Sequence, residues 1–359
     1  MNFLYRRVFS AVNDASLCLM SLFLTLSACS DVVDLGAEAS EEQLVIYGRI
    51  TDGKAGNEVQ VALTSPINGE QEAISDAELI LLENGAAKAV YREIAPGRYR
   101  LDMPADSARE GNSYQLQVML PNGKTYLSAA ATMPGLVAVD HPRFDASTVE
   151  VIVNQQGTTR EQRLVQLFVD TDILNQEQDF YLKWNVIAAY SFQERARDGN
   201  IPPPCYIIND VTGQQTELFN GAEIKVDRIP NVMLASTPVD SRFAFDFYFL
   251  VVQSTMDEAA YQYLSLIDQM SNTVGSIFDK PSAPVPGNFR NVENPDEEVL
   301  GYFEVVRSDT TWVRLRSDDV PGFIQPPCPF LPDYSREPPE CLGCLLIKNS
   351  SYHRPYYWF

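Results

Sequence analysis

The feature that most constrains the fold is a series of short segments between residues 44 and 129 in which apolar and polar residues alternate. Alternation with a period of two is typical of β-strands that have one buried face. Turn sequences such as Asn84-Gly85, Pro96-Gly97 and Asn122-Gly123 separate the segments. The pattern predicts an immunoglobulin-like or prealbumin-like β-sandwich over residues 44–135, although the Cys…Trp…Cys pattern of a true immunoglobulin domain is missing. The expected strands are Leu44–Ile50, Glu58–Leu63, Ala77–Leu82, Val90–Ile94, Gly97–Leu101, Ser113–Leu120 and Thr125–Ala129.

Met133-Pro134-Gly135 marks the expected boundary with a larger β-rich domain over residues 136–359. Leu164–Val169 and Phe180–Ile187 are expected to pair with each other across an acidic connection. That connection lacks the spacing of a calcium loop, since Asn175 stands where the loop requires glycine. We therefore predict no metal site and no cofactor.

Phe243–Val252 is the most apolar strand expected in this second domain. Phe243, Phe245, Phe247 and Phe249 alternate along it, which predicts one buried face of a central strand. An aromatic platform for a sugar is the functional alternative.

One amphipathic helix is expected over residues 256–271, directly after this strand. Asp257 and Glu258 would lie at its positive end, and its apolar residues recur at intervals of three and four. The predicted role of this helix is to pack on the sheet. The fold class expected from the whole chain is therefore mostly β, with one sandwich, one larger β-rich domain and one helix.

The N-terminal residues 1–28 have the composition of an export signal. Arg6 and Arg7 precede a short apolar run that ends in Leu26-Ser27-Ala28-Cys29, and this ending matches the bacterial lipobox. The match predicts that Cys29 becomes the lipidated first residue of the mature chain. Residues 29–43 are small and acidic, and we interpret them as a tether. Their acidic start resembles the export signal that sends Bacteroidota lipoproteins to the cell surface.

The charge of the mature chain limits the classes of partner that we expect it to bind. Removal of residues 1–28, which hold Arg6, Arg7 and Asp14, changes the net charge from −21 to −22. Such a charge argues against nucleic acid and anionic lipid headgroups. We expect no nucleic-acid partner, and membrane contact through the lipid anchor only.

Four cysteines remain once Cys18 leaves with the signal and Cys29 takes the lipid. An even number in an exported protein predicts two disulfides, for which three connectivities are possible. The Cys-x-x-Cys spacing of the last two also fits a redox motif or half of a zinc site. A proline-rich setting and the absence of a second close pair favour structural disulfides that pin the C-terminal tail to the second domain. The four cysteines are Cys205, Cys328, Cys341 and Cys344.

Residues 275–303 contain an unusual combination of glycine, proline and asparagine. Such residues favour turns, stiffen extended backbone and bond nearby main chain, so we expect an ordered irregular loop across the sheet. It would lead to strands at Val299–Val306 and Thr311–Leu315. The loop is either a structural clamp or a partner-binding surface. Its candidate residues are Gly275, Phe278, Pro286, Gly287, Asn288, Asn291, Gly301 and Phe303.

These motifs, the lipobox and the terminal Cys-x-x-Cys with Pro355 and Trp358 resemble domain-of-unknown-function family 4249. The resemblance covers essentially the whole mature chain, but Arg354 and its neighbours depart from the acidic residue common near the terminal Trp. It implies a Bacteroidota outer-membrane lipoprotein that is an accessory of a TonB-dependent receptor and helps to capture or gate its substrate. It implies no catalytic residues.

Two alternatives stay open. A structural envelope lipoprotein without a ligand has the same anchor and the same β-domains. An exported hydrolase would require a catalytic set, and His141 and His353 are the only histidines that could centre a triad. Neither histidine accompanies a nucleophile motif such as Gly-x-Ser-x-Gly. The sequence therefore favours a non-enzymatic protein at the outer membrane, facing the cell exterior.

Overall fold

The computed structural model describes residues 42–53, 56–64, 71–102, 108–152, 157–173, 179–195, 200–211, 217–223, 226–273, 285–328 and 338–358. The signal peptide, Cys29 and nearly all of the tether lie outside these residues, as do Gly275 and Phe278 of the motif loop. The described part is mostly β with one α-helix, which confirms the expected fold class. Its helices include none with the length and apolar character needed to cross a bilayer.

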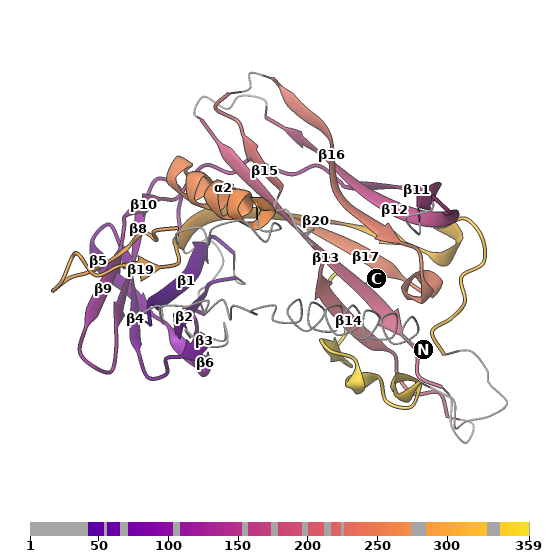
Figure 1. Ribbon diagram of the computed structural model, residues 1–359, viewed down its shortest axis with the longest axis horizontal. Helices are drawn as coiled ribbons and strands as arrows, with labels where there is room; N and C mark the ends of the chain where they lie inside the picture. The colour runs from indigo at the N-terminus through magenta and orange to yellow at the C-terminus, as the bar shows by residue number, and fades with distance from the viewer. Residues whose placement is uncertain are drawn as a thin grey trace, which may run out of the picture. The chain divides into compact units, whose positions relative to one another are not determined.

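A twelve-stranded sheet runs through the described part of the chain (Figure 1). Its strands are β1 (Leu44–Thr51), β2 (Glu58–Thr64), β3 (Gln71–Ala73), β6 (Arg92–Ala95), β7 (Arg98–Arg100), β13 (Tyr181–Phe192), β14 (Cys205–Asp210), β15 (Glu217–Asn220), β17 (Phe247–Met256), β19 (Val299–Leu300), β20 (Phe303–Leu315) and β21 (Ser350–Ser351). The main path has the order β21-β14-β13-β17-β20-β1-β2-β7-β6. The first strand after the tether, β1, therefore lies inside the sheet.

A six-stranded sheet completes the N-terminal sandwich. It consists of β4 (Glu78–Glu83), β5 (Ala86–Val90), β8 (Ser113–Met119), β9 (Thr125–Ser128), β10 (Ala131–Thr132) and β18 (Phe289–Asn291). Its apolar face and that of β1 and β2 enclose a core that includes Ile46, Leu81 and Leu116. The same core contains Phe289, Val299, Phe303 and Val305, so the C-terminal third of the chain completes the sandwich.

Strand β20 joins the two halves of the large sheet. Its first residues pair in parallel with β1, from Gly48 opposite Phe303 to Thr51 opposite Val306. From Arg307 onward it pairs antiparallel with β17. The bounds predicted for the strands Val299–Val306 and Thr311–Leu315 are therefore wrong. The break between β19 and β20 falls at Gly301, and β20 continues without interruption to Leu315.

A three-stranded sheet of β11 (Arg143–Ile152), β12 (Thr159–Asp172) and β16 (Arg228–Pro238) packs over the second half of the large sheet. The expected pairing of Leu164–Val169 with Phe180–Ile187 is wrong. Strand β12 bonds to β11 and β16, whereas β13 bonds to β17 on one edge and to β14 and β15 on the other. Strands β12 and β13 do not pair with each other because other strands occupy both edges of each.

The helix α2 (Glu258–Thr273) begins two residues later than expected. The Asp257 carboxylate accepts a hydrogen bond from Ala260 N at 2.9 Å and so caps its first turn. Ala260 and Leu264 are buried against Tyr181 and Tyr302. The packing role predicted for the helix is thus what its buried face performs.

The phenylalanine strand differs from the expectation at its start. A 3₁₀ turn, η1 (Ser241–Ala244), precedes β17, which begins only at Phe247. Phe243, Phe247 and Phe249 are core residues, and the rings of Phe243 and Phe247 stack with centroids 4.2 Å apart. Phe245 is 37% exposed instead, because the backbone turns before it. Three of the four rings therefore confirm the core interpretation.

Candidate functional site

The described residues of the motif loop bring main chains into direct contact. Gly301 has a φ of +89°, and a Cβ there would collide with the carbonyl oxygen of Ile46 on β1. A Cβ at Gly287 would collide with the carbonyl oxygen of Gly301. Gly287 N donates to Val299 O at 3.2 Å, and Pro286 forms a bridge with Leu300. Glycine is required at both places because the backbones leave no room for a side chain.

Asn288 extends this contact with its side chain. Its Oδ1 accepts a hydrogen bond from Phe303 N at 2.9 Å, and its Nδ2 donates to Phe303 O at 3.0 Å. On the main chain, Ala129 N donates to Asn288 O at 2.7 Å. The Phe303 ring is fully buried in the sandwich core. Asn288 therefore ties the loop to β20 and to the end of β9.

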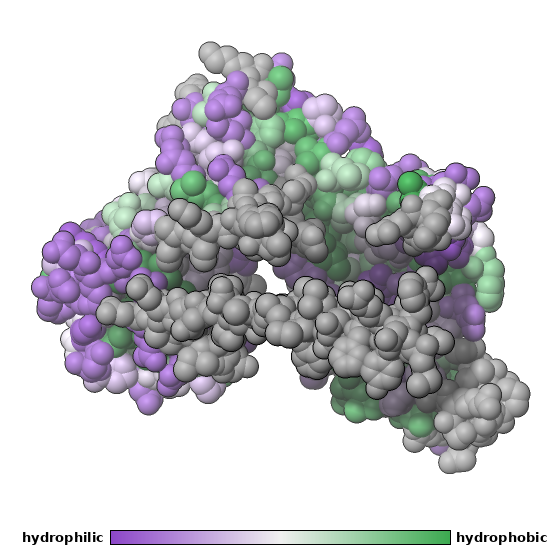
Figure 2. Space-filling view, in the orientation of Figure 1, coloured by the Kyte–Doolittle hydropathy of each residue, from purple (hydrophilic) through white to green (hydrophobic). Residues whose placement is uncertain are grey.

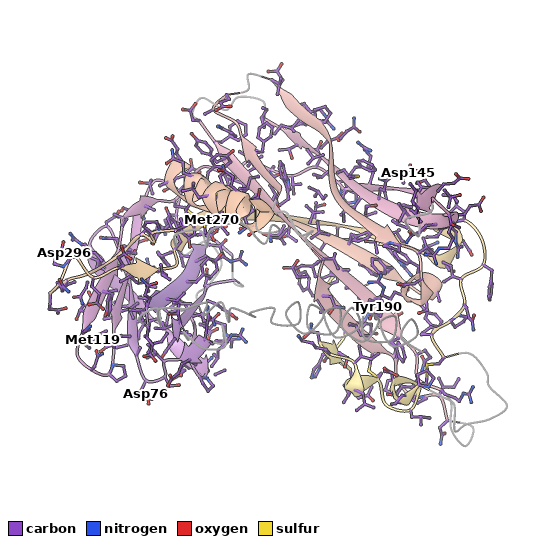
Figure 3. All side chains as sticks on the ribbon, in the orientation of Figure 1. Asp76, Met119, Asp145, Tyr190, Met270 and Asp296 are labelled. Atoms are coloured by element: carbon purple, nitrogen blue, oxygen red, sulfur yellow. A yellow bond between two sulfur atoms is a disulfide. The ribbon has the colours of Figure 1, made fainter. Side chains whose placement is uncertain are left out.

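Asn291 organises the turn that follows β18, which Asp296 marks in Figure 3. The Asn291 Oδ1 accepts from Glu293 N at 2.8 Å, and its Nδ2 donates to Glu297 Oε2 at 2.6 Å. Glu297 also accepts from Tyr126 and Lys124 on the β9 hairpin. Burial acts to raise the pKa of Glu297, but these hydrogen bonds outweigh it and lower the pKa.

The motif residues are thus engaged inside the protein. Contacts with β1, β9, β19, β20 or the turn after β18 are made by Pro286, Gly287, Asn288, Asn291, Gly301 and Phe303. This geometry favours the structural clamp over the partner-binding surface. Gly275 and Phe278 belong to the same motif and lie outside the described residues.

A buried carboxylate lies on the other face of β20. Glu304 is 1% exposed, and its Oε1 accepts a hydrogen bond from the Tyr47 hydroxyl at 2.6 Å, with Lys183 Nζ at 3.9 Å. Burial and the adjacent carboxylate raise the pKa of Tyr47 and that of Tyr263. Tyr47 therefore stays protonated and donates its hydroxyl hydrogen to the Glu304 side chain. Because Tyr47 lies on β1, Lys183 on β13 and Glu304 on β20, the cluster links the two halves of the large sheet.

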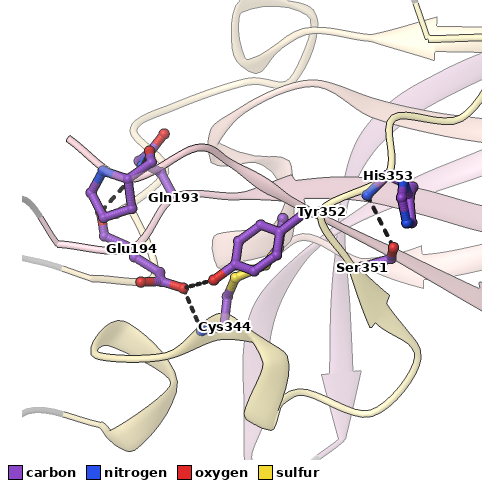
Figure 4. The surroundings of a disulfide bond; sticks show 8 residues. Gln193, Glu194, Cys344, Ser351, Tyr352 and His353 are labelled. Atoms are coloured by element: carbon purple, nitrogen blue, oxygen red, sulfur yellow. Dashed lines mark hydrogen bonds between the residues drawn. A yellow bond between two sulfur atoms is a disulfide. The ribbon is translucent and has the colours of Figure 1, made fainter.

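The cysteines form two disulfides, Cys205–Cys344 and Cys328–Cys341. The first ties the C-terminal segment to β14, as expected for a pinned tail, and the second closes a loop within that segment. Glu194 Oε1 accepts from Cys344 N at 2.8 Å and from the Tyr352 hydroxyl at 3.0 Å (Figure 4). Glu194, Cys205 and Cys344 lie close enough to hold a metal ion. In this structure, however, the two sulfurs are bonded to each other and are not free thiolate ligands.

A groove lies beside this anchor, and we call it the tail groove. It has a volume of about 490 Å³ and combines aromatic rings with charged and amide groups. Its main lining residues are Gln193, Tyr206, Phe245, Asp246, Arg316 and Trp358. A neighbouring hollow of about 270 Å³ shares Gln193 and Phe245 with it and reaches Pro326 and Pro327.

Packing fixes the walls of the tail groove. Trp358 lies against Tyr206 and Tyr248, with ring centroids 4.9 and 4.5 Å apart. Asp246 accepts three hydrogen bonds from Arg314, at 2.7, 2.8 and 3.0 Å. One sequence signal points to this groove: Phe245 belongs to the alternating phenylalanines, for which an aromatic platform is the functional alternative. No sequence signal predicts that Trp358, close to the C-terminus, forms part of the opposite wall of the tail groove.

The other candidate residues lie apart from the tail groove. A larger hollow of about 630 Å³ is lined by Tyr47, Arg49, Glu58 and Arg98, and the last two form an ion pair at 2.9 Å. His141 lies 3.4 Å from Thr311 on β20, and His353 follows β21. The structure thus places the two histidines on separate elements.

A match to a protein family spans most of the residues described above. A family model described as a domain of unknown function, DUF4249, matches residues 31–311. The chain belongs to this family. The DUF4249 match includes the whole motif loop and β1, whereas Cys328, Cys341, Cys344 and the aromatic end of the tail groove lie beyond it. No curated protein and no solved structure matches the chain.

Proposed function

We propose that this DUF4249 protein is an outer-membrane lipoprotein that faces the cell exterior, attached through acylated Cys29. In this proposal it is a non-enzymatic accessory, or substrate-capture partner, of a TonB-dependent receptor. The lipobox and the resemblance to Bacteroidota lipoproteins associated with such receptors support it.

The observation that carries the proposal is the position of β1. This strand begins at Leu44, directly after the tether of residues 29–43, and pairs with β2 on one edge and with β19 and β20 on the other. A tether of this length spans at most about 50 Å. An anchor that leads into the middle of a sheet holds the whole β body near the membrane, as an accessory of a membrane receptor requires.

The tail groove supports the substrate-capture role. Ligand sites in proteins are usually concave and combine apolar or aromatic walls with a few polar groups that fix orientation. Phe245 and Tyr206 offer ring surfaces, while Gln193, Asp246 and Arg316 offer an amide and both signs of charge. This combination fits a polar ligand with some apolar surface, such as a sugar or a peptide.

The test is an affinity pull-down from native outer membranes, with a tag joined by a linker after Phe359. We expect one TonB-dependent receptor in near-stoichiometric amount. Cys29→Ala should abolish both acylation and receptor recovery, whereas Cys18→Ala, a matched change within the signal, should leave both intact. Protease treatment of intact cells should digest the protein if it faces outward.

The alternatives give different results. If intact, acylated protein recovers no partner, the result supports the alternative of a structural envelope lipoprotein without a ligand. A reproducible activity in a hydrolase screen, lost on mutation of a groove residue such as Asp246→Asn, would indicate an exported hydrolase and overturn the proposal.

A further inference from the structure

Two consecutive turns in the C-terminal segment hold three leucines in solvent. Leu342, Leu345 and Leu346 follow or lie within η4 (Pro339–Cys341) and η5 (Cys344–Leu346), and are 42%, 56% and 68% exposed. We call them the leucine turns. Figure 2 shows hydrophobic residues at the surface near the yellow C-terminal segment of Figure 1. Single exposed leucines are common on proteins, but three within five residues form a small apolar patch.

The fold prevents the leucine turns from burying these side chains. Cys341 and Cys344 point inward, are at most 1% exposed, and are fixed by disulfides to Cys328 and Cys205. The main chain closes each turn, because Leu342 N donates to Pro339 O and Leu346 N donates to Gly343 O, both at 3.0 Å. With the cysteines facing inward, the residues beside them must face outward.

Two exposed basic residues follow the leucine turns, and one acidic residue, Glu340, lies within η4. Residues 341–359 contain Lys348 and Arg354 and no acidic side chain, although the whole chain has a net charge of −21. Tyr352 and Tyr356 follow in the same segment and are 44% and 84% exposed. Tyr352 lies next to the second turn, since its hydroxyl and Cys344 N bond to the same oxygen of Glu194.

We propose that the leucine turns are a lipid-facing contact that inserts into the interface of a bilayer. Leucine enters the acyl boundary, tyrosine prefers the headgroup level, and lysine and arginine interact with lipid phosphates. The segment supplies all three kinds of residue on a braced scaffold. A protein partner would bury the same leucines, and the crosslinking test below separates it from a bilayer. The inference rests on the proposed lipid anchor but not on the proposed receptor. It adds a second membrane contact, where the sequence predicted contact through the anchor only.

The test is site-specific photocrosslinking of the acylated full chain in vesicles of phosphatidylethanolamine and phosphatidylglycerol. A benzophenone side chain replaces Leu345 in one variant. In the matched control it replaces Ile152, which is 73% exposed at the end of β11. We expect lipid adducts at position 345 with a yield on the order of tenfold above that at position 152.

A second variant separates the contribution of charge. Lys348→Glu with Arg354→Glu should reduce the lipid adduct at position 345, since each basic residue near an anionic surface changes partitioning about fivefold. An unchanged thermal unfolding midpoint checks that each variant is folded. Equal lipid adducts at positions 345 and 152 would overturn the proposal. So would protein adducts in place of lipid adducts in native membranes, which would assign the surface to a protein partner.

Discussion

Asn288 and Phe303 pair as two strand residues would, except that Asn288 uses its side-chain amide in place of its backbone. The amide oxygen accepts from Phe303 N at 2.9 Å, and the amide nitrogen donates to Phe303 O at 3.0 Å. The pair satisfies both main-chain groups of the first residue of β20, at the point where this strand starts to pair with β1. Residues far apart in the family motif thus close the sandwich.

The first prediction concerns this pair. Asn288→Ala should lower the free energy of unfolding by about 2–3 kcal/mol, because two hydrogen bonds are lost and the Phe303 main chain is left without partners. Asn294→Ala, an exposed change in the next turn, should change it by less than about 0.5 kcal/mol. Denaturant titration measures both. Equal effects of the two variants would contradict the clamp.

The second prediction concerns the close backbone contacts. Gly301→Ala should destabilise the protein by about 3 kcal/mol or more, because the added Cβ meets Ile46 O and the residue must keep a positive φ. Gly343→Ala is the matched control, since its added Cβ would have its nearest neighbour at 3.9 Å. Thermal unfolding of the two variants checks this, and an unchanged midpoint for Gly301→Ala would show that β1 and the loop do not touch in solution.

The third prediction concerns the disulfides. Removal of Cys205–Cys344, which are 139 residues apart, should cost up to about 5 kcal/mol of stability. Removal of Cys328–Cys341, which are 13 residues apart, should cost up to about 3 kcal/mol, because a shorter loop constrains the unfolded chain less. Unfolding of the paired alanine variants without reductant gives both values.

Non-reducing peptide mass spectrometry tests the connectivity itself. Cys341 and Cys344 fall on one tryptic peptide, so the Cys328→Ala/Cys341→Ala variant is needed. Its peptides around Cys205 and Cys344 should remain linked. Free thiols at these two positions would refute the pairing.

The fourth prediction concerns acid sensitivity. Hydrogen bonds from Asn231 N, Arg228 and Arg143 lower the pKa of Asp170 from 3.8 to about 2 and join β12 to β16 and β11. Because the pKa is lower in the folded state, this stabilisation is complete above about pH 5 and is lost as the pH falls through 4 toward 2. Asp170→Asn should reduce the stability at neutral pH and flatten its decrease over this range.

The control for this pH profile is Asp145→Asn, an exposed change on β11. It should keep the wild-type dependence of unfolding free energy on pH. A wild-type slope in Asp170→Asn would mean that Asp170 does not contribute to acid sensitivity.

Most of the correct predictions rest on patterns between residues that are neighbours in the sequence. Six of the seven strands expected from Leu44 to Ala129 match β1, β2, β4, β7, β8 and β9 closely, because alternation and turn residues such as Asn84-Gly85 act between neighbours in sequence. The seventh, Val90–Ile94, overlaps β6 and only the last residue of β5. The helix was also predicted within two residues, since its cap and apolar spacing are local. The glycines of the motif loop predicted backbone freedom at turns, whereas the close backbone approach at Gly287 and Gly301 was revealed by the structure.

What the sequence alone determined about this protein is therefore its strands, turns, helix and even number of cysteines. The tertiary structure decided the rest: the pairing of β12 with β16, the parallel contact of β1 with β20, the disulfide connectivity, and a tail groove with Trp358 in its wall. The physical reason is that hydrogen bonds between strands carry no residue-specific code. Partners far apart in the chain are selected by the burial of whole faces, which only the assembled cores determine.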